Sequence, residues 1–198
     1  IKYFRENNLD KLIDQKNLPN KVVSSLNDLA YLHKMIREKK SVTVLEFGVG
    51  YSSLVIADAL ANNEKEYSKS SKKVNIRNRS KFQLFSVDAS KKWIDRTKEM
   101  MPEFLEDRVN FIFSEVKIST FRGQLCHFYT NLPDIVPDFV YLDGPDPKDV
   151  KGNINGLSFQ CDERTVMSAD LLLMESTLLP GTTILVDGRT NNARFLNR

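Results

Sequence analysis

Five short apolar runs of the chain each end at, or next to, an acidic residue. These residues are Glu46, Asp88, Glu115, Asp143 and Asp187. Any one of them is explained equally well by a turn, because Asp and Gly are common turn formers. Five in series, with a glycine-rich turn after the first run, favour a functional site. Carboxylates gathered in one place attract cations, hold metal ions or accept protons.

The glycine-rich turn has the sequence EFGVGYSS and extends from Glu46 to Ser53. Gly48 and Gly50 let the chain turn sharply and let a ligand approach the backbone. Dinucleotide sites usually have a third glycine, and Ser53 stands at that position here. Glu46 would repel a phosphate but would suit a cationic ammonium or sulfonium group. The turn therefore favours S-adenosylmethionine (SAM) over NAD as the ligand.

Alternating helix and strand patterns would position these residues. Strands are expected at residues 42–47, 82–87, 109–113, 139–142 and 182–186. They are continuous apolar runs, which is typical of a parallel sheet covered by helices on both faces. In such a sheet, ligands bind beyond the carboxyl ends of the strands. The predicted fold is α/β, a three-layer sandwich around a mainly parallel, Rossmann-like sheet.

Helices are expected before and between the strands. The first covers about residues 20–38 and carries His33 on its apolar face, so this histidine is expected to be packed rather than catalytic. A short helix is expected at residues 125–130, and a last one can begin at residue 191. Three serines can cap the remaining helices: Ser52, Ser90 and Ser168.

The chain of 198 residues suits a single domain, with a helical segment at residues 1–40 and an α/β core at residues 41–198.

The connection at residues 62–81 is long and basic. A segment that binds nucleic acid would be positively charged like this one, but it would usually also carry several aromatic residues, and Tyr67 is the only one in this connection. A solvated, mobile loop is therefore favoured over a nucleic-acid partner.

Composition is that of an ordinary globular protein, with 41% hydrophobic residues, 28% charged residues and a net charge of +3. Apolar runs fall short of the roughly 20 residues that span a bilayer, and no signal-peptide pattern opens the chain, which begins with Ile1. A cytoplasmic protein is expected.

Cys126 and Cys161 lack neighbouring Cys or His at ligand spacing, so two free thiols are favoured over a disulfide or a zinc site.

LEFGVGYSS resembles the first motif of the class I SAM-dependent methyltransferases, and FSVDAS resembles their second. In that family Glu46 would meet the amino group of SAM, directly or through water, and Asp88 would accept hydrogen bonds from its ribose. Glu115, or Ser114 beside it, would lie near the adenine. The resemblance thus implies these cofactor-binding residues: Glu46, Gly48, Gly50, Ser52, Asp88 and Glu115.

The segments PDFVYLDGPDP and LLLMESTLLPGTTILVDGR are similar to catechol O-methyltransferase and its relatives. In that group two strand-end aspartates help to hold a divalent metal, and Asp143 and Asp187 match them. The next residue, commonly Asn, is Gly188, so one ligand is missing and Mg²⁺ is left as an open alternative. Without a metal, Asp143 or Asp146 would accept the proton of the acceptor. The catalytic candidates are Asp143, Asp146 and Asp187.

The leading hypothesis is a SAM-dependent methyltransferase that methylates an oxygen atom of a small molecule. An RNA or protein methyltransferase is a related alternative, although the Asn-Pro-Pro-Tyr motif of N-methylating nucleic-acid enzymes does not follow the fourth strand. An NAD(P)-dependent oxidoreductase is a second, because Asp88 would also suit an adenosine ribose. A third is a non-catalytic Rossmann-like module. Arg189 would either pair with an acidic group of the substrate or be a surface cation.

A complete sheet of this family has seven strands, and two of them would follow Asp187. Only eleven residues remain. The C-terminal strands are therefore expected to be missing, in a truncated chain or in a reduced variant. Self-association into a homo-oligomer is left open.

Overall fold

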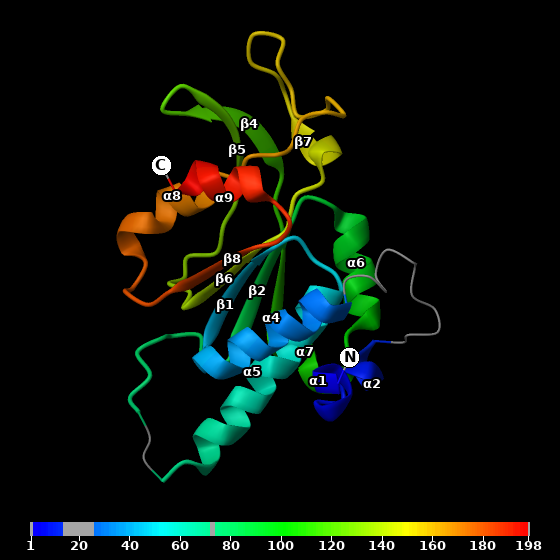
Figure 1. The fold of residues 1–198 in the computed structure, drawn as a ribbon, viewed down its shortest axis with the longest axis vertical. Coiled ribbons are helices and arrows are strands. Elements are labelled where there is room, and N and C mark those ends of the chain that lie inside the picture. The colour runs from blue at the N-terminus through cyan, green and yellow to red at the C-terminus, as the bar shows by residue number, and fades with distance from the viewer. Residues whose placement is uncertain (1, 14–25, 72–73, 198) are drawn as a thin grey trace.

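The computed structural model describes residues 2–13, 26–71 and 74–197. At its centre is a five-stranded parallel sheet with the strand order β3-β2-β1-β6-β8 (Figure 1). The strands are β1 (Thr43–Phe47), β2 (Gln83–Asp88), β3 (Val109–Phe113), β6 (Phe139–Leu142) and β8 (Thr183–Val186). The chain builds the sheet outwards from β1 in both directions, as Rossmann-like folds do. The predicted parallel α/β sheet is confirmed.

The strand register brings the carboxyl ends of the three central strands to one edge. Phe47 at the end of β1 is level with Val87 on one side and with Leu142 on the other. β1 and β6 are buried along their whole length, which explains their continuous apolar sequences. The residues that follow these strands, Gly48 and Asp143, therefore leave the sheet side by side.

Helices cover one face of the sheet and flank its ends (Figure 1). Their bounds are α1 (Lys2–Glu6), α2 (Leu9–Leu12), α4 (Leu26–Lys39), α5 (Tyr51–Lys69), α6 (Lys91–Met100), α7 (Glu103–Glu106), α8 (Asp170–Met174) and α9 (Thr190–Leu196). Two single 3₁₀ turns are η2 (Pro147–Asp149) and η3 (Glu175–Thr177). α1, α2, α4 and α5 share one apolar cluster with one face of the sheet, and α8 packs into another cluster on the opposite face. The three layers are thus helix, sheet, and a mixed layer.

The mixed layer contains a second, smaller sheet that lies over the carboxyl end of the first (Figure 1). It consists of β4 (Val116–Phe121), β5 (Gln124–Tyr129) and β7 (Val150–Lys151). β4 and β5 pair antiparallel, and Arg122 and Gly123 between them both have positive φ, as a two-residue hairpin turn requires. The short helix predicted at residues 125–130 is wrong, because β4 supplies this segment with a partner strand.

Two predicted helix boundaries also need correction. α5 begins at Tyr51 and extends to Lys69, so that residues 62–69 of the supposed basic loop are helical. The extension is held by Arg37, which donates to Asn63 and pairs with Glu66. α8 is only five residues long and begins at Asp170. Residues 20–25 of the first predicted helix lie outside the described residues.

Of the three serines predicted as caps, one is a cap. Ser90 Oγ accepts a hydrogen bond from the amide of Trp93 at 3.3 Å and caps α6. Ser52 lies inside α5 and donates to Glu46 instead, and Ser168 donates to Asp170. A hydroxyl with a buried carboxylate in reach binds it in preference to a helix amide, because charge-assisted hydrogen bonds are the stronger ones.

The N-terminal helices are joined to the core by a buried histidine. The two ring nitrogens of His33 lie 2.8 Å from the hydroxyl of Tyr3 and 3.0 Å from the carboxylate of Asp58. His33 is completely buried, so the prediction of a packed histidine is confirmed. Cys126 and Cys161 are both free thiols, as expected. No helix in the described part of the chain is both long and apolar enough to cross a membrane.

Candidate functional site

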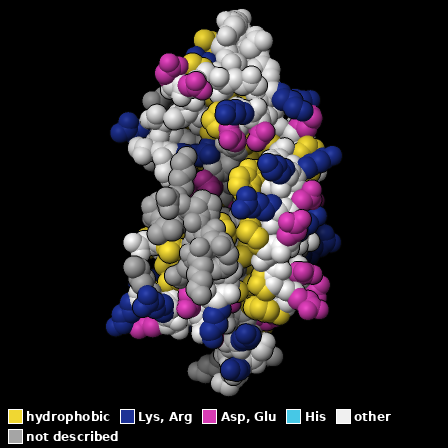
Figure 2. Space-filling view, turned by 90° about the vertical axis from the view of Figure 1, so that its right-hand side faces the viewer, with side chains coloured by type: hydrophobic (Ala, Val, Ile, Leu, Met, Phe, Trp, Pro, Cys, Tyr) yellow, Lys and Arg dark blue, Asp and Glu magenta, His cyan; other side chains and the backbone are white. Residues whose placement is uncertain are grey.

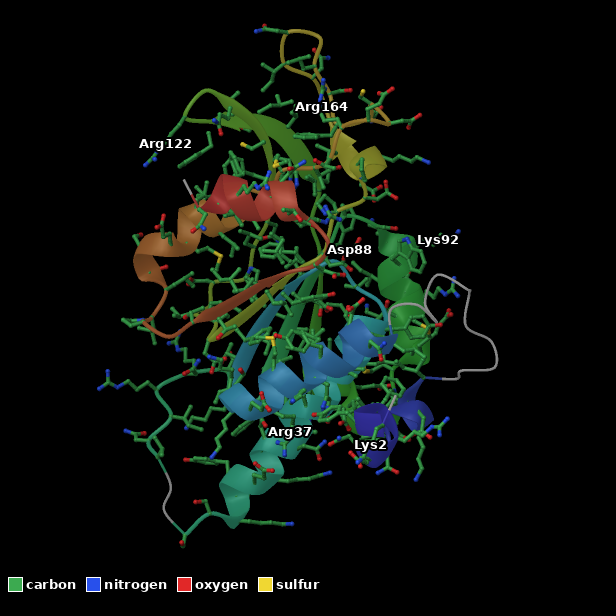
Figure 3. All side chains as sticks on the ribbon, in the orientation of Figure 1. Lys2, Arg37, Asp88, Lys92, Arg122 and Arg164 are labelled. Atoms are coloured by element: carbon green, nitrogen blue, oxygen red, sulfur yellow. The ribbon has the colours of Figure 1, made fainter. Side chains whose placement is uncertain are left out.

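A pocket of about 330 Å³ lies where the central strands end. Figure 3 shows Asp88 at this place, where the central sheet meets the second sheet. The pocket is lined by Gly48, Val49, Asp88, Trp93, Asp143, Gly144, Pro145, Asp146, Pro147, Asp149 and Arg189. Four of these side chains are carboxylates and one is a cation. The acidic crevice predicted at the carboxyl edge of the sheet is therefore present.

Gly48 and Gly144 form the floor of the pocket by packing directly against each other. The carbonyl oxygen of Phe47 accepts from the amide of Asp143 at 2.9 Å and from the amide of Gly144 at 2.6 Å. A Cβ atom on Gly48 would lie 2.9 Å from the nitrogen of Gly144, and Gly48 has a φ of +95°. Two adjacent strands can turn together here only because neither residue has a side chain.

Glu46 lies beneath the loop rather than in the pocket. Its fully buried carboxylate accepts hydrogen bonds from three serine hydroxyls: Ser52 at 2.5 Å, Ser53 at 2.6 Å and Ser86 at 2.6 Å. Burial raises the pKa of Glu46 to about 7, although these hydrogen bonds act in the opposite direction. Neither Glu46 nor Ser52 lines the pocket, and a contact of Glu46 with the amino group of SAM, directly or through water, stays a prediction, as does a contact of Ser52 with the cofactor. Glu46 and Ser52 hold the start of α5 to β1 and β2.

Gly50, the second glycine of the predicted turn, precedes α5. Its amide donates to Ser53 Oγ at 3.2 Å, and a Cβ on Gly50 would meet no atom within 4 Å. Gly50 therefore has space around it but does not line the pocket. Its predicted role under the methionine of SAM stays a prediction.

Asp88 lines the pocket and also fixes the glycine loop. One carboxylate oxygen accepts from the amide of Val49 at 3.0 Å and the other from the amide of Ser90 at 2.7 Å. Burial raises the pKa of Asp88, while the two amide hydrogen bonds lower it. Each carboxylate oxygen can accept a second hydrogen bond. Asp88 can thus bind two adjacent ligand hydroxyls, as predicted for a ribose.

Asp143 combines burial with a second carboxylate close by. Its burial and the charge of Asp187 raise the pKa of Asp143 to about 6, against the opposing charge of Arg189. Asp187 itself accepts a hydrogen bond from the hydroxyl of Tyr141 at 2.9 Å and does not line the pocket. Asp146 is exposed at the rim, where its carboxylate caps η2. Of the three catalytic candidates, Asp143 is the one that lines the pocket directly after a strand of the central sheet.

The donor set around Asp143 and Asp187 is incomplete for a divalent metal. Within residues 2–13, 26–71 and 74–197, no three His, Cys, Asp or Glu side chains converge as metal ligands. One oxygen of Asp187 is taken by Tyr141, and Gly188 has no side chain to offer. Mg²⁺ prefers six oxygen ligands in near-octahedral geometry. The residues present do not fit a dedicated Mg²⁺ site.

Glu115 lies outside the pocket, on the surface. Its carboxylate forms an ion pair with Lys151 at 2.5 Å, and the hydrogen bond from Lys151 lowers the pKa of Glu115. The neighbouring Ser114 is buried, and its hydroxyl accepts from the amide of Asn131 at 2.8 Å. A contact of either residue with adenine stays a prediction, and each side chain already has a partner in the protein.

Several site residues were missed by sequence reasoning. Asp149 lies in a segment without periodicity, although the sequence DPKD, with proline after its first aspartate, is a signal for a short turn that carries two carboxylates. Tyr129 was missed because its segment was taken for a helix. Trp93 on α6 also lines the pocket, with 48% of its surface exposed.

Comparison with known proteins gives similarity at the level of structure alone. No family model matches the sequence, and no curated protein matches it. A SAM-bound O-methyltransferase of tomaymycin synthesis from Streptomyces achromogenes has 16% identity and a TM-score of 0.40, covering 75% of this chain and 56% of that one. An O-methyltransferase from Bacillus cereus, in complex with S-adenosylhomocysteine (SAH), has 15% identity and a TM-score of 0.38, covering 74% and 54%.

An SAH-bound methyltransferase from Podospora anserina has 14% identity and a TM-score of 0.42, and the match covers 94% of this chain and 60% of that one. The chain thus spans between one half and two thirds of the length of these solved structures.

Proposed function

We propose that the chain binds SAM in the pocket at the carboxyl edge of the sheet and transfers the methyl group to an oxygen atom of a small molecule. One observation carries the proposal. Gly48, Asp88 and Asp143, from the ends of three adjacent parallel strands, converge on one pocket beside the first strand of the sheet. Open α/β sheets bind their ligands at this point, where the strand order reverses.

The charges of the pocket favour a cationic ligand. Among the described residues that line it, four are aspartates and one, Arg189, carries the opposite charge. A carboxylate attracts a positive charge close by more strongly in a partly buried site than in bulk water, because the effective dielectric constant is lower there. SAM carries a sulfonium and an ammonium group. NAD(P), the alternative from another class, would bring a pyrophosphate among the same carboxylates, so the pocket supports it less well even though Asp88 suits the ribose of either.

Asp143 is the residue that we assign to proton transfer. Bound SAM supplies an electrophilic methyl group, and the protein has to align the acceptor oxygen with it. With a pKa of about 6, Asp143 is mostly ionised at pH 7 and is able to accept the hydroxyl proton of an acceptor. A general base works best when its pKa lies near the operating pH. No step of this proposal uses a metal, because the donor set does not fit one.

The acceptor that we propose is a small molecule, because the pocket is compact. On the face shown in Figure 2, basic and acidic side chains are interspersed, as on a solvated surface. On that face, this distribution of charge does not favour a nucleic-acid partner. The cytoplasmic location and the possible self-association predicted from the sequence remain predictions, as does the organisation of all 198 residues as one domain.

Calorimetric titration with SAM, SAH and NAD⁺ tests the proposal. Wild-type protein is expected to bind SAM and SAH in the micromolar range and to bind NAD⁺ much more weakly. D88A should lower the affinity for SAH by roughly tenfold or more, since hydrogen bonds to a charged group contribute about 1.5–3 kcal/mol. D95A, which removes an exposed aspartate of α6, is the matched control. Folded wild-type protein that fails to bind SAM and SAH at millimolar concentration contradicts the proposal.

A further inference from the structure

A buried tyrosine hydroxyl lies against the floor of the pocket without a hydrogen-bond partner. Tyr129 on β5 is only 5% exposed, and no described residue bonds to its hydroxyl. His127, two residues earlier on the same face of the strand, likewise has two buried ring nitrogens without partners. A buried polar atom left without a partner costs about 1–3 kcal/mol. Such atoms are rare in folded proteins and call for an explanation such as a bound group.

The Tyr129 hydroxyl lies directly beneath a residue of the pocket floor, although Tyr129 itself does not line the pocket. The hydroxyl lies 2.9 Å from the position that a Cβ of Gly144 would occupy, and Gly144 lines the pocket. The tyrosine ring packs against Phe47, with 5.4 Å between the ring centroids, which fixes its direction. Burial and the charge of Asp88 raise the pKa of Tyr129 well above its usual value. Tyr129 therefore stays protonated and is a hydrogen-bond donor at every working pH.

Arg189 approaches the same turn from the pocket side. Its guanidinium donates to the carbonyl oxygen of Pro145, the residue after Gly144, at 3.2 Å. Four aspartates line the same pocket, yet Arg189 forms no ion pair with any residue in the described part of the chain. A guanidinium has five N–H donors, so most of those of Arg189 remain available. The Gly144–Pro145 turn thus lies beside a phenol without a described hydrogen-bond partner and a guanidinium with unused donors, whose charge acts on Asp143 without forming an ion pair with it.

We propose that Tyr129 and Arg189 together bind a carboxylate group of the ligand beside the Gly144–Pro145 turn. The inference rests on the proposed function and deepens it. An arginine and a protonated phenol both donate to carboxylate oxygens, and hydrogen bonds of this kind are the strong ones. The aspartates of the pocket suit a positive charge, so the pocket as a whole suits a ligand with charges of both signs. The carboxylate belongs either to the amino-acid end of SAM or to the acceptor.

Two variants test this proposal, each with a matched control. R189Q removes the charge, and R194Q removes an exposed arginine from α9, the helix that begins directly after Arg189. Y129F removes only the hydroxyl, and Y31F does the same at a tyrosine that is 56% exposed. Each protein is titrated calorimetrically with SAH and with 5′-methylthioadenosine, which lacks the amino-acid end. If the carboxylate is that of the cofactor, R189Q and Y129F bind SAH roughly tenfold more weakly, while 5′-methylthioadenosine and the controls are unaffected.

A second titration identifies a carboxylate that belongs to the acceptor. SAH-loaded proteins are titrated with benzoate and with its neutral analogue benzamide, and binding is followed by ligand-observed NMR. Benzoate binding that is lost in R189Q and Y129F, with benzamide unchanged, supports an acceptor that carries a carboxylate. Variants that bind SAH and benzoate as the wild type does overturn the inference and leave the proposed function intact. If the wild-type protein does not bind SAH, this result contradicts the proposed function itself and therefore also the inference that rests on it.

The thermal stability of Y129F separates a ligand contact from a structural role. Because the hydroxyl has no partner within the protein, its removal is expected to leave the melting temperature of the ligand-free protein unchanged or to raise it. Loss of SAH or benzoate affinity at undiminished stability is the result that we expect. A fall in melting temperature together with affinity assigns a structural role to the hydroxyl and contradicts the proposal for Tyr129.

Discussion

Gly48 and Gly144 pack back to back, so that a Cβ atom on Gly144 would lie 2.7 Å from the nitrogen of Gly48. This contact joins the turns that follow β1 and β6 and sets the position of Asp143 relative to the glycine loop. The hydroxyl of Tyr129 closes the third side at 2.9 Å from the same Cβ position. The pocket floor is therefore made of backbone from two strands, and its shape depends on the absence of two side chains.

Three glycine-to-alanine variants separate the causes of this requirement. At Gly144 a side chain would collide with neighbouring backbone atoms, but the backbone conformation allows one. At Gly156 there is room for a side chain, but the positive φ of +79° disfavours it. At Gly48 both the collision and the positive φ disfavour a side chain. We expect G144A to cost about 1–3 kcal/mol of stability through overpacking. G48A should cost more than G144A, and G156A should leave SAH affinity unchanged. Urea unfolding and calorimetric titration with SAH measure both effects. A G144A protein with wild-type stability and affinity contradicts the packing argument.

Much of the central fold could be predicted because its signals are local. β1 and β6 are buried on both faces and read as continuous apolar runs, and each is followed by the turn residues of the pocket. The position of Asp88 and Asp143 at one edge follows from the parallel topology alone. This is why the pocket, its acidic character and two of its main residues were predictable.

The remaining features depend on contacts that are distant in sequence. β5 forms because β4 pairs with it, and the segment at residues 125–130 does not show this by itself. Glu46 lies beneath the loop because Ser86, forty residues away, approaches it from β2 together with two serines of α5. The donors Tyr129 and Arg189 come from the second sheet and from the start of α9, so only the three-dimensional structure brings them to the same turn.

The ionisation of Asp143 is expected to set the fall of kcat/KM at acidic pH. As a base Asp143 must be ionised, so kcat/KM for the acceptor found by screening should fall about tenfold per pH unit below a pKa of about 6. D143N should remove this fall and lower kcat by roughly 10²–10⁴-fold. D107N, at an exposed aspartate far from the pocket, is the control. If D146N rather than D143N removes the fall at acidic pH, the base is Asp146.

Glu46 is expected to make the fold less stable as pH rises through its titration. Its folded-state pKa of about 7 lies above its usual value of 4.5, so between these values the folded protein holds a proton that the unfolded chain has released. Stability from this group is therefore present below pH 4.5 and is lost as pH approaches and passes 7. E46Q cannot titrate, and its stability should fall less steeply than that of the wild type between pH 5 and pH 7.5. Urea unfolding at a series of pH values measures the difference. Parallel pH profiles for the two proteins would show that Glu46 titrates normally. E38Q, at an exposed glutamate, is the control.

The N-terminal helices are expected to be part of the folding unit rather than an appendage. Phe4 on α1 and Leu9 on α2 are buried in one apolar cluster with residues of α4 and α5, and Tyr3 is bonded to the buried His33. F4A should therefore destabilise the whole domain by about 3–5 kcal/mol, as the loss of a buried aromatic ring does. Y31A, at a largely exposed aromatic residue of α4, should change stability by less than about 1 kcal/mol. Both are measured by urea unfolding, followed by the fluorescence of the single tryptophan, Trp93, which lines the pocket. If F4A leaves the unfolding midpoint reported by Trp93 unchanged, the N-terminal helices and the α/β core unfold independently, and residues 1–40 do not belong to the same cooperative unit.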